Sequence, residues 1–180
     1  VYSVIKFRRK DDGLDADGQH ITGSSKIVGI WLVATSLLCI FVIFNPGLVG
    51  LNELKAREVD PDVVVQVKGM QFTWIATYPD QGVTTNKIVL PVGKRIRFDV
   101  SSTDVLHSFW IPVFRTKMDA LPGQVTRMYV NPTVIGSYDE NKDFRVQCAE
   151  LCGIHHNNMR IPVEVVSVAD YENWINEMAQ

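Results

Sequence analysis

The sequence predicts a mainly β domain carried by a single N-terminal membrane helix. Two observations lead to this fold class: an uncharged apolar run near the N-terminus, and short β-rich runs separated by turn signals through the rest of the chain. The 18 Lys and Arg residues nearly balance the 20 Asp and Glu residues. No broad basic surface is therefore expected, and nucleic acid is excluded as a partner. Three cysteines are too few for a disulfide scaffold.

The membrane helix is expected over residues 27–49. The run Ile27–Phe44 carries no charge, and only Thr35 and Ser36 interrupt its apolar character. A helix needs roughly 20 apolar residues to cross a bilayer. Pro46-Gly47 is expected to end the helix. A buried core helix is the alternative, but such a helix normally carries a polar stripe.

The flanks of this helix predict its orientation. More basic residues precede the span, within an N-terminal segment 1–26, than follow it. Those before it are Lys6, Arg8, Arg9, Lys10 and Lys26, and those after it are Lys55 and Arg57. The positive-inside rule then predicts a cytoplasmic N-terminal flank and an outward-facing C-terminal domain, in a single-pass chain surrounded by lipid. The apolar stretch Val1–Ile5 resembles the end of a preceding segment.

The remainder divides into a linker over 50–60, a β domain over 61–168 and a C-terminal helix over 169–180. In the helix, Tyr171, Trp174, Ile175 and Met178 recur at helical spacing, and Ser167 is the expected cap. About eight short strands in this length favour an antiparallel sandwich or small barrel. The expected strands are Val63–Lys68, Gln71–Thr77, Lys87–Leu90, Arg95–Val100, Phe109–Val113, Gln124–Val130, Phe144–Gln147 and Pro162–Val168.

Candidate metal ligands cluster in one short segment near the C-terminus. Cys148, Cys152, His156 and Met159 lie within twelve residues, and His107 is a candidate second imidazole from upstream. Thiolates and thioethers are soft ligands that favour copper, while imidazole suits both copper and zinc. A methionine in the set favours a copper electron-transfer site over a zinc site.

Simpler interpretations of the same residues stay open at this point. Outside the cytoplasm the two cysteines could form a disulfide. They could also hold a structural zinc ion together with His155 or His156. Met159 could simply fill the core. None of these alternatives explains why four soft or borderline ligand types occur together in so short a segment.

Residues 148–159 have the pattern C-x-E-x-C-x-x-x-H-x-x-M. Two further motifs, Asp104-Val-Leu-His107-Ser and then Lys117-Met-Asp119, lie upstream of it. Together they resemble subunit II of the haem-copper cytochrome c oxidases. The order of a membrane helix followed by an external β domain is similar as well. The resemblance implies a cupredoxin-like Greek-key sandwich and a dinuclear copper centre of the CuA type. It extends from the basic stretch Lys6–Lys10 to the end of the chain.

Carried over residue by residue, the resemblance implies specific roles. Cys148 and Cys152 would bridge two copper ions, and His107 and His156 would each cap one of them. Met159 and the backbone carbonyl of Glu150 would be weak ligands. The Glu150 side chain would point toward a magnesium or manganese site shared with subunit I.

The implied activity is that of the electron-accepting subunit of a cytochrome-c oxidase. It would take electrons from a cytochrome c or small copper protein and pass them to haem in subunit I, where dioxygen is reduced to water. A subunit III is the further expected partner, and a bacterial plasma membrane the expected location.

The sequence also departs from the family pattern. Where relatives carry a tryptophan at the point at which electrons enter, this chain has Phe72, followed by Trp74 as the second aromatic residue; both could equally be core residues. The stretch Gly23–Val28 lacks the acidic residue associated with proton uptake. Asp104, Asp119 and Asp139 are candidates for an acidic docking patch.

Two other classes share some of these features. A membrane-anchored copper chaperone or thiol-disulfide protein would have a cysteine pair opening a helix early in a βαβ fold, with its histidine downstream. A nitrous-oxide reductase shares the CuA loop but joins it to a large propeller domain. A quinol-oxidising relative would lack the copper cysteines.

Overall fold

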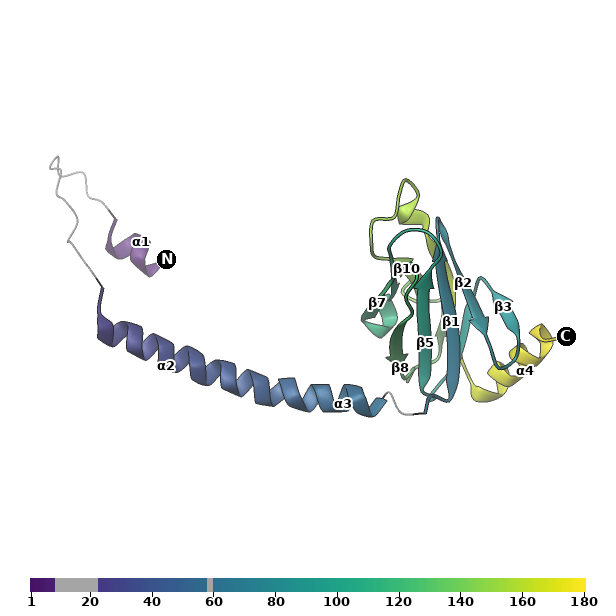
Figure 1. The fold of residues 1–180 in the computed structure, drawn as a ribbon, viewed down its shortest axis with the longest axis horizontal. Coiled ribbons are helices and arrows are strands. Elements are labelled where there is room, and N and C mark those ends of the chain that lie inside the picture. Colours follow the sequence, from purple (N-terminus) through teal and green to yellow (C-terminus); the bar gives the residue numbers. More distant parts are fainter. Residues whose placement is uncertain (9–22, 58–59) are drawn as a thin grey trace. The chain divides into compact units, whose positions relative to one another are not determined.

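Among the residues that the structure describes, one helical stretch, Ser25–Glu53, has the length and mean hydropathy (2.7) needed to cross a membrane. The computed structural model describes residues 1–8, 23–57 and 60–180, which form two units, Val1–Gly50 and Leu51–Gln180 (Figure 1). A short helix, α1 (Tyr2–Lys6), lies at the N-terminus. Arg9 and Lys10, which contributed to the predicted orientation, lie outside the described residues, as does most of the segment 1–26.

This candidate membrane helix begins with α2 (Ser25–Val42), and Ser24 caps it through a hydrogen bond from the Ile27 amide. Thr35 donates its hydroxyl proton to the carbonyl of Trp31, so this polar side chain is satisfied within the helix.

The regular helix is interrupted beside Pro46, as expected, but it resumes beyond the break. The chain kinks at Asn45, whose backbone angles are φ −140° and ψ 106°, and passes through a wide turn, η1 (Ile43–Leu48). It then resumes as α3 (Val49–Arg57), so the stretch expected to be a linker at 50–60 is helical as far as Arg57. A proline lacks the amide proton of a regular helix and its ring crowds the preceding turn, which accounts for a kink here.

Two β-sheets form the C-terminal unit. The first has the strand order β3-β2-β1-β5-β8, and the second has the order β4-β11-β10-β6-β7, with β9 paired to β11. The strands are β1 (Val63–Met70), β2 (Thr73–Tyr78), β3 (Val83–Thr85), β4 (Ile88–Pro91), β5 (Ile96–Ser102), β6 (His107–Ile111), β7 (Thr116–Ala120), β8 (Thr126–Val130), β9 (Gly136–Ser137), β10 (Arg145–Cys148) and β11 (Arg160–Val166).

The sheets are mixed and not purely antiparallel as expected. β1 pairs with β5 in parallel, from Val63 opposite Ile96 to Gly69 opposite Ser102. β11 pairs with β4 in parallel as well. Alternating apolar residues identify the buried face of each strand but not its neighbour, so the crossovers that make these parallel pairs leave no local signal.

The core lies between the two sheets and is lined by alternate residues of the strands. In β5 the side chains of Ile96, Phe98 and Val100 are fully buried, which confirms the face predicted from their alternation. Trp74, Tyr78 and Phe109 are the largest aromatic members of the core. Because β1 and β5 run in parallel, the turns that follow them meet at one end of the domain, beside the loop after β10 (Figure 1).

The predicted C-terminal helix is confirmed as α4 (Val168–Met178). The Ser167 hydroxyl accepts a hydrogen bond from the Asp170 amide, as expected for the cap. Tyr171 and Ile175 are buried on its inner face, and Trp174 packs edge-on against Tyr78 of β2. Met178 lies largely exposed at the end of the helix.

Candidate metal centre

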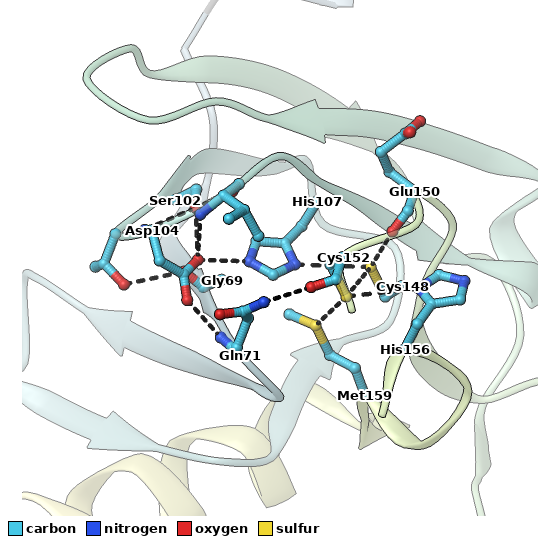
Figure 2. A network of polar contacts seen from close by, with 12 residues as sticks. Gly69, Gln71, Ser102, Asp104, His107, Cys148, Glu150, Cys152, His156 and Met159 are labelled. Carbon is cyan, nitrogen blue, oxygen red and sulfur yellow. Dashed lines mark hydrogen bonds and ion pairs between the residues drawn. The ribbon is translucent and has the colours of Figure 1, made fainter. Parts of the chain in front are cut away.

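Three loops meet at the end of the β domain where β1 and β5 finish. They are the turn Gln71–Phe72 between β1 and β2, the loop that leads into β6 at His107, and the segment from Cys148 to Met159 (Figure 2). The first two are brought together by the parallel pairing of β1 with β5 and by the hydrogen bond from the Thr103 amide to the Gly69 carbonyl.

Two thiols and one imidazole form the centre of this cluster. The Cys148 and Cys152 sulfur atoms are 3.8 Å apart, and the Cys148 sulfur is 3.8 Å from Nδ1 of His107. The ligand atoms of these three residues all lie within 4.8 Å of one another, a spacing that one or more metal ions could bridge. All three side chains are buried, His107 completely. Both thiols are free in this structure, at a distance well beyond a covalent S–S bond.

The remaining candidate ligands surround the Cys152 and Cys148 sulfurs. His156 approaches Cys152 with its Nδ1 at 3.5 Å, and the Met159 sulfur lies 3.7 Å from the same thiol. The backbone carbonyl of Glu150 is 3.2 Å from the Cys148 sulfur. Figure 2 shows the His107 and His156 rings on opposite sides of the two thiols. The structure thus brings together the five side chains and the carbonyl that the sequence analysis singled out.

The other sequence candidates lie around this cluster. The Glu150 carboxylate is exposed and points away from the sulfurs (Figure 2). Phe72 is partly buried and meets the ring of His155 edge-on, with 5.2 Å between centroids, so His155 faces Phe72. Trp74 is fully buried against the His107 ring, at 5.8 Å.

Asp104 has a different environment from that of a surface docking residue. Its carboxylate accepts hydrogen bonds from the Gln71 and Val105 amides, and one of its oxygens lies 2.7 Å from Nε2 of His107. Desolvation raises the pKa of Asp104, but these hydrogen bonds outweigh it and lower the pKa to about 2. The carboxylate therefore stays ionised and fixes the His107 tautomer that carries the proton on Nε2, which leaves Nδ1 free to face the thiols.

Two residues of this network were not identified as site residues from the sequence. From the sequence, Asp104 is part of the motif that contains His107 and a candidate docking acid, and Gln71 begins an expected strand; neither is expected to contact the ligand groups. The Gln71 side chain donates a hydrogen bond to the Cys152 carbonyl across 81 positions of sequence. The Asp-x-x-His spacing was a usable signal for Asp104, whereas Gln71 gave none.

Burial also controls the protonation of Cys152. Desolvation raises the pKa of the Cys152 thiol, and the neighbouring Cys148 raises it further. Without a cation the Cys152 thiol is therefore held protonated. A metal ion would have to displace that proton in order to bind the thiolate.

The donor set fits copper better than zinc. Two thiols, two imidazoles and a thioether are soft or borderline ligands, and no carboxylate oxygen takes part in the cluster among the described residues. The cysteine pair follows a β-strand of an all-β core, and His107 precedes it in sequence, unlike the arrangement expected of a thiol-disulfide protein.

The fold and the site together define a cupredoxin-like domain with a thiolate-rich metal centre at one end. Residues 80–166 match the family model described as "Cytochrome C oxidase subunit II, periplasmic domain". The chain belongs to the cytochrome c oxidase subunit II family.

Individual relatives support this membership. The chain is 46% identical to cytochrome c oxidase subunit 2 of Thermostichus vulcanus, with 97% of the chain and 66% of that protein aligned. The crystal structure of the periplasmic domain of subunit II (CoxB) of Bradyrhizobium japonicum is 29% identical, with a TM-score of 0.60, over 66% of this chain and 94% of that one. A second structure is a mixed disulfide between a thioredoxin-like protein and a subunit II domain; it is 28% identical, with a TM-score of 0.58, over 67% of this chain and 92% of that one. Several curated relatives are matched over only half to two thirds of their own length.

Proposed function

We propose that this chain is the electron-accepting subunit of a respiratory haem-copper oxidase and relays electrons through a dinuclear copper centre. The observation that carries the proposal is the pair of buried thiols, 3.8 Å apart, with one imidazole nitrogen near each: Nδ1 of His107 by Cys148 and Nδ1 of His156 by Cys152. A pair of thiolates with one imidazole on either side is suited to two metal ions sharing both sulfurs.

Each remaining donor has a role in this proposal. The Met159 thioether, fully buried beside Cys152, would be a weak ligand to one copper ion. The Glu150 carbonyl, beside Cys148, would be a weak ligand to the other. Weak ligands of this kind tune the potential of a copper centre without governing whether copper binds.

Bound at this site, the two copper ions would accept one electron at a time and pass it on. The protein keeps the ligands in nearly the same positions for both charge states, because His107 and the cysteines are buried and His107 is held by Asp104. Protein ligands surround the centre, so no position is left for a substrate, and the reduction of dioxygen to water is assigned to haem-containing subunit I.

The loops above the centre supply a surface for the electron donor. Leu151 and Ile154 are 79% and 87% exposed, and Val105 and Leu106, in the loop that leads into β6, are exposed as well. We propose that a cytochrome c or small copper protein docks here through apolar contacts. Phe72, which meets the His155 ring, and Trp74, which contacts the His107 ring, are the aromatic residues proposed to assist electron entry.

The exposed Glu150 side chain fits the proposed magnesium or manganese site shared with subunit I. Its carboxylate points out of the copper cluster while its carbonyl points in, so one residue can serve both metals. Subunit III is a further proposed partner. The apolar helix Ser25–Glu53 and the periplasmic family of the domain favour a bacterial plasma membrane, with the metal centre on the outer side.

Copper can load only when both thiols are reduced. We propose that a thioredoxin-like dithiol protein reduces any Cys148–Cys152 disulfide, forming a mixed disulfide and then leaving with the new disulfide, as the related structure suggests. Both electrons and both protons come from the partner's dithiol.

The relay is tested in the intact oxidase by rapid mixing with a reduced donor. We expect the copper absorbance to bleach before haem is reduced, and a Cys152→Ser variant to lose that early phase. Haem reduction that precedes or bypasses the copper signal, at the same rate in the variant, contradicts the proposal.

A further inference from the structure

The turn between β1 and β2 contacts both groups of candidate metal ligands through a single residue. The Gln71 amide donates to Oδ2 of Asp104 at 2.7 Å, and its side-chain Nε2 donates to the Cys152 carbonyl at 2.5 Å. Gln71 is thus hydrogen-bonded through its backbone to Asp104, which contacts His107, and through its side chain to the loop that carries Cys152 (Figure 2).

On the His107 side, the contact is made through the Asp104 carboxylate. Oδ2 receives the Gln71 amide, while Oδ1 faces Nε2 of His107 at 2.7 Å and receives the Val105 amide at 2.6 Å. Ser102 adds its hydroxyl at 3.2 Å. A carboxylate with this many donors has little freedom, so the position of the His107 ring is fixed relative to the Gln71 backbone.

On the cysteine side, the loop packs closely against the same turn. Gly153 has φ +132°, and a Cβ at this position would lie 3.0 Å from Gln71 Nε2 and 3.1 Å from the Phe72 ring. His155 adds its ring edge-on to Phe72. A glycine is required here both by the backbone conformation and by the closeness of the turn.

The hydrogen bond of the Gln71 side chain is not needed to form the turn itself. The backbone pairing of Met70 with Thr73 and of Gly69 with Trp74 already closes the turn. The side-chain amide is directed away from this hairpin toward a carbonyl 81 residues later in the chain. This hydrogen bond therefore affects the distance between the two segments that carry the candidate ligands, the loop before His107 and the cysteine loop.

We propose that Gln71 is a positioning residue that sets the separation between His107 and the cysteine loop, and that the centre is therefore held in its binding geometry before any metal arrives. That this positioning serves copper binding rests on the proposed function. The arrangement itself can be tested without copper. It predicts that the Cys152–Met159 loop is ordered in the copper-free protein.

The test uses the full chain in detergent, reduced and copper-free, with Gln71→Met as the main variant. Methionine has nearly the same length but no amide proton to donate. Gln81→Met, at an exposed glutamine in the β2–β3 turn, is the matched control. Hydrogen exchange of the Cys152–Met159 amides is the primary measurement, and we expect it to be about 3- to 10-fold faster in Gln71→Met, from the loss of one hydrogen bond. The strand amides of β1 and β5 should exchange at the wild-type rate in both variants.

A second readout separates positioning from simple stabilisation. After copper loading, Gln71→Met should bind as much copper as wild type but with altered optical and EPR spectra, whereas Gln81→Met should match wild type. The proposal is overturned if loop exchange is unchanged within twofold, if all strands exchange faster together with the loop, or if the spectra are those of wild type. If wild type itself binds no copper, the proposed function fails, and the positioning role stands or falls on the exchange rates alone.

Discussion

Gly69 in β1 lies against two buried rings, those of Trp74 and His107. Adding one methyl group at Gly69 gives a sharp test of how the centre is packed. A Cβ at this position would be 2.9 Å from Cζ3 of Trp74 and 3.1 Å from Cδ2 of His107. Both rings are fully buried, so neither can swing toward solvent to make room. Gly69→Ala must therefore displace one of them or the strand itself.

The expected cost follows from this overlap. Overpacking a well-filled core by one methyl group costs about 1 to 3 kcal/mol, and two rigid rings in contact with the new group favour the upper half of that range. Because His107 is one of the rings, we also expect its Nδ1 to move away from the Cys148 sulfur, which it now faces at 3.8 Å. Copper binding should weaken together with stability.

The measurement is urea unfolding of the copper-free full chain in detergent, followed by tryptophan fluorescence, together with a copper titration. Gly50→Ala is the control, since nothing lies within 4 Å of a Cβ there. We expect the control to leave unfolding of the β domain unchanged. A loss below about 0.5 kcal/mol for Gly69→Ala, against the overpacking range, together with unaltered copper affinity, would refute the packing described for this site.

Three further outcomes follow from individual contacts. Burial, reinforced by the charge of Asp80, raises the pKa of Tyr171 from 10.0 to about 12, so the neutral phenol stabilises the fold below pH 10 and this stability is lost as pH rises toward 12. Tyr171→Phe should be near neutral at pH 7, where the hydroxyl has no partner among the described residues, and should unfold less readily than wild type in alkaline urea titrations. Met159→Leu should keep the copper content, measured by metal analysis, and shift the reduction potential; loss of copper would contradict a weak-ligand role. Lys87→Ala removes an ion pair of 2.7 Å with Glu164 that is about one-third exposed, and should cost less than about 1 kcal/mol, and less still in high salt.

The parts of this protein that could be predicted from the sequence are those with local causes. The long apolar helix follows from an uncharged run, α4 from helical spacing and a serine cap, and the candidate ligands from soft donors at close intervals. His107 could be added as an upstream imidazole that completes the ligand set, although the sequence places it in a loop before a strand at Phe109 and the structure makes it the first residue of β6.

The features that were missed depend on pairings between distant residues. The strand β7 (Thr116–Ala120) has a single buried side chain, Ala120, so its alternation gives only a weak apolar signal, and β9 has only two residues. The parallel pairs of β1 with β5 and of β4 with β11 depend on crossovers and not on composition. Likewise, Asp104 resembles any surface carboxylate until the fold brings four donors to it.

The central claim is that the two thiols hold a pair of copper ions that share one unpaired electron. The most direct measurement is the EPR spectrum of the copper-loaded, partly oxidised full chain, together with its copper content. We predict two copper ions per chain and a hyperfine pattern in which the electron is coupled equally to both nuclei. A pattern from a single copper nucleus, or a chain that retains no copper after desalting, would contradict the claim.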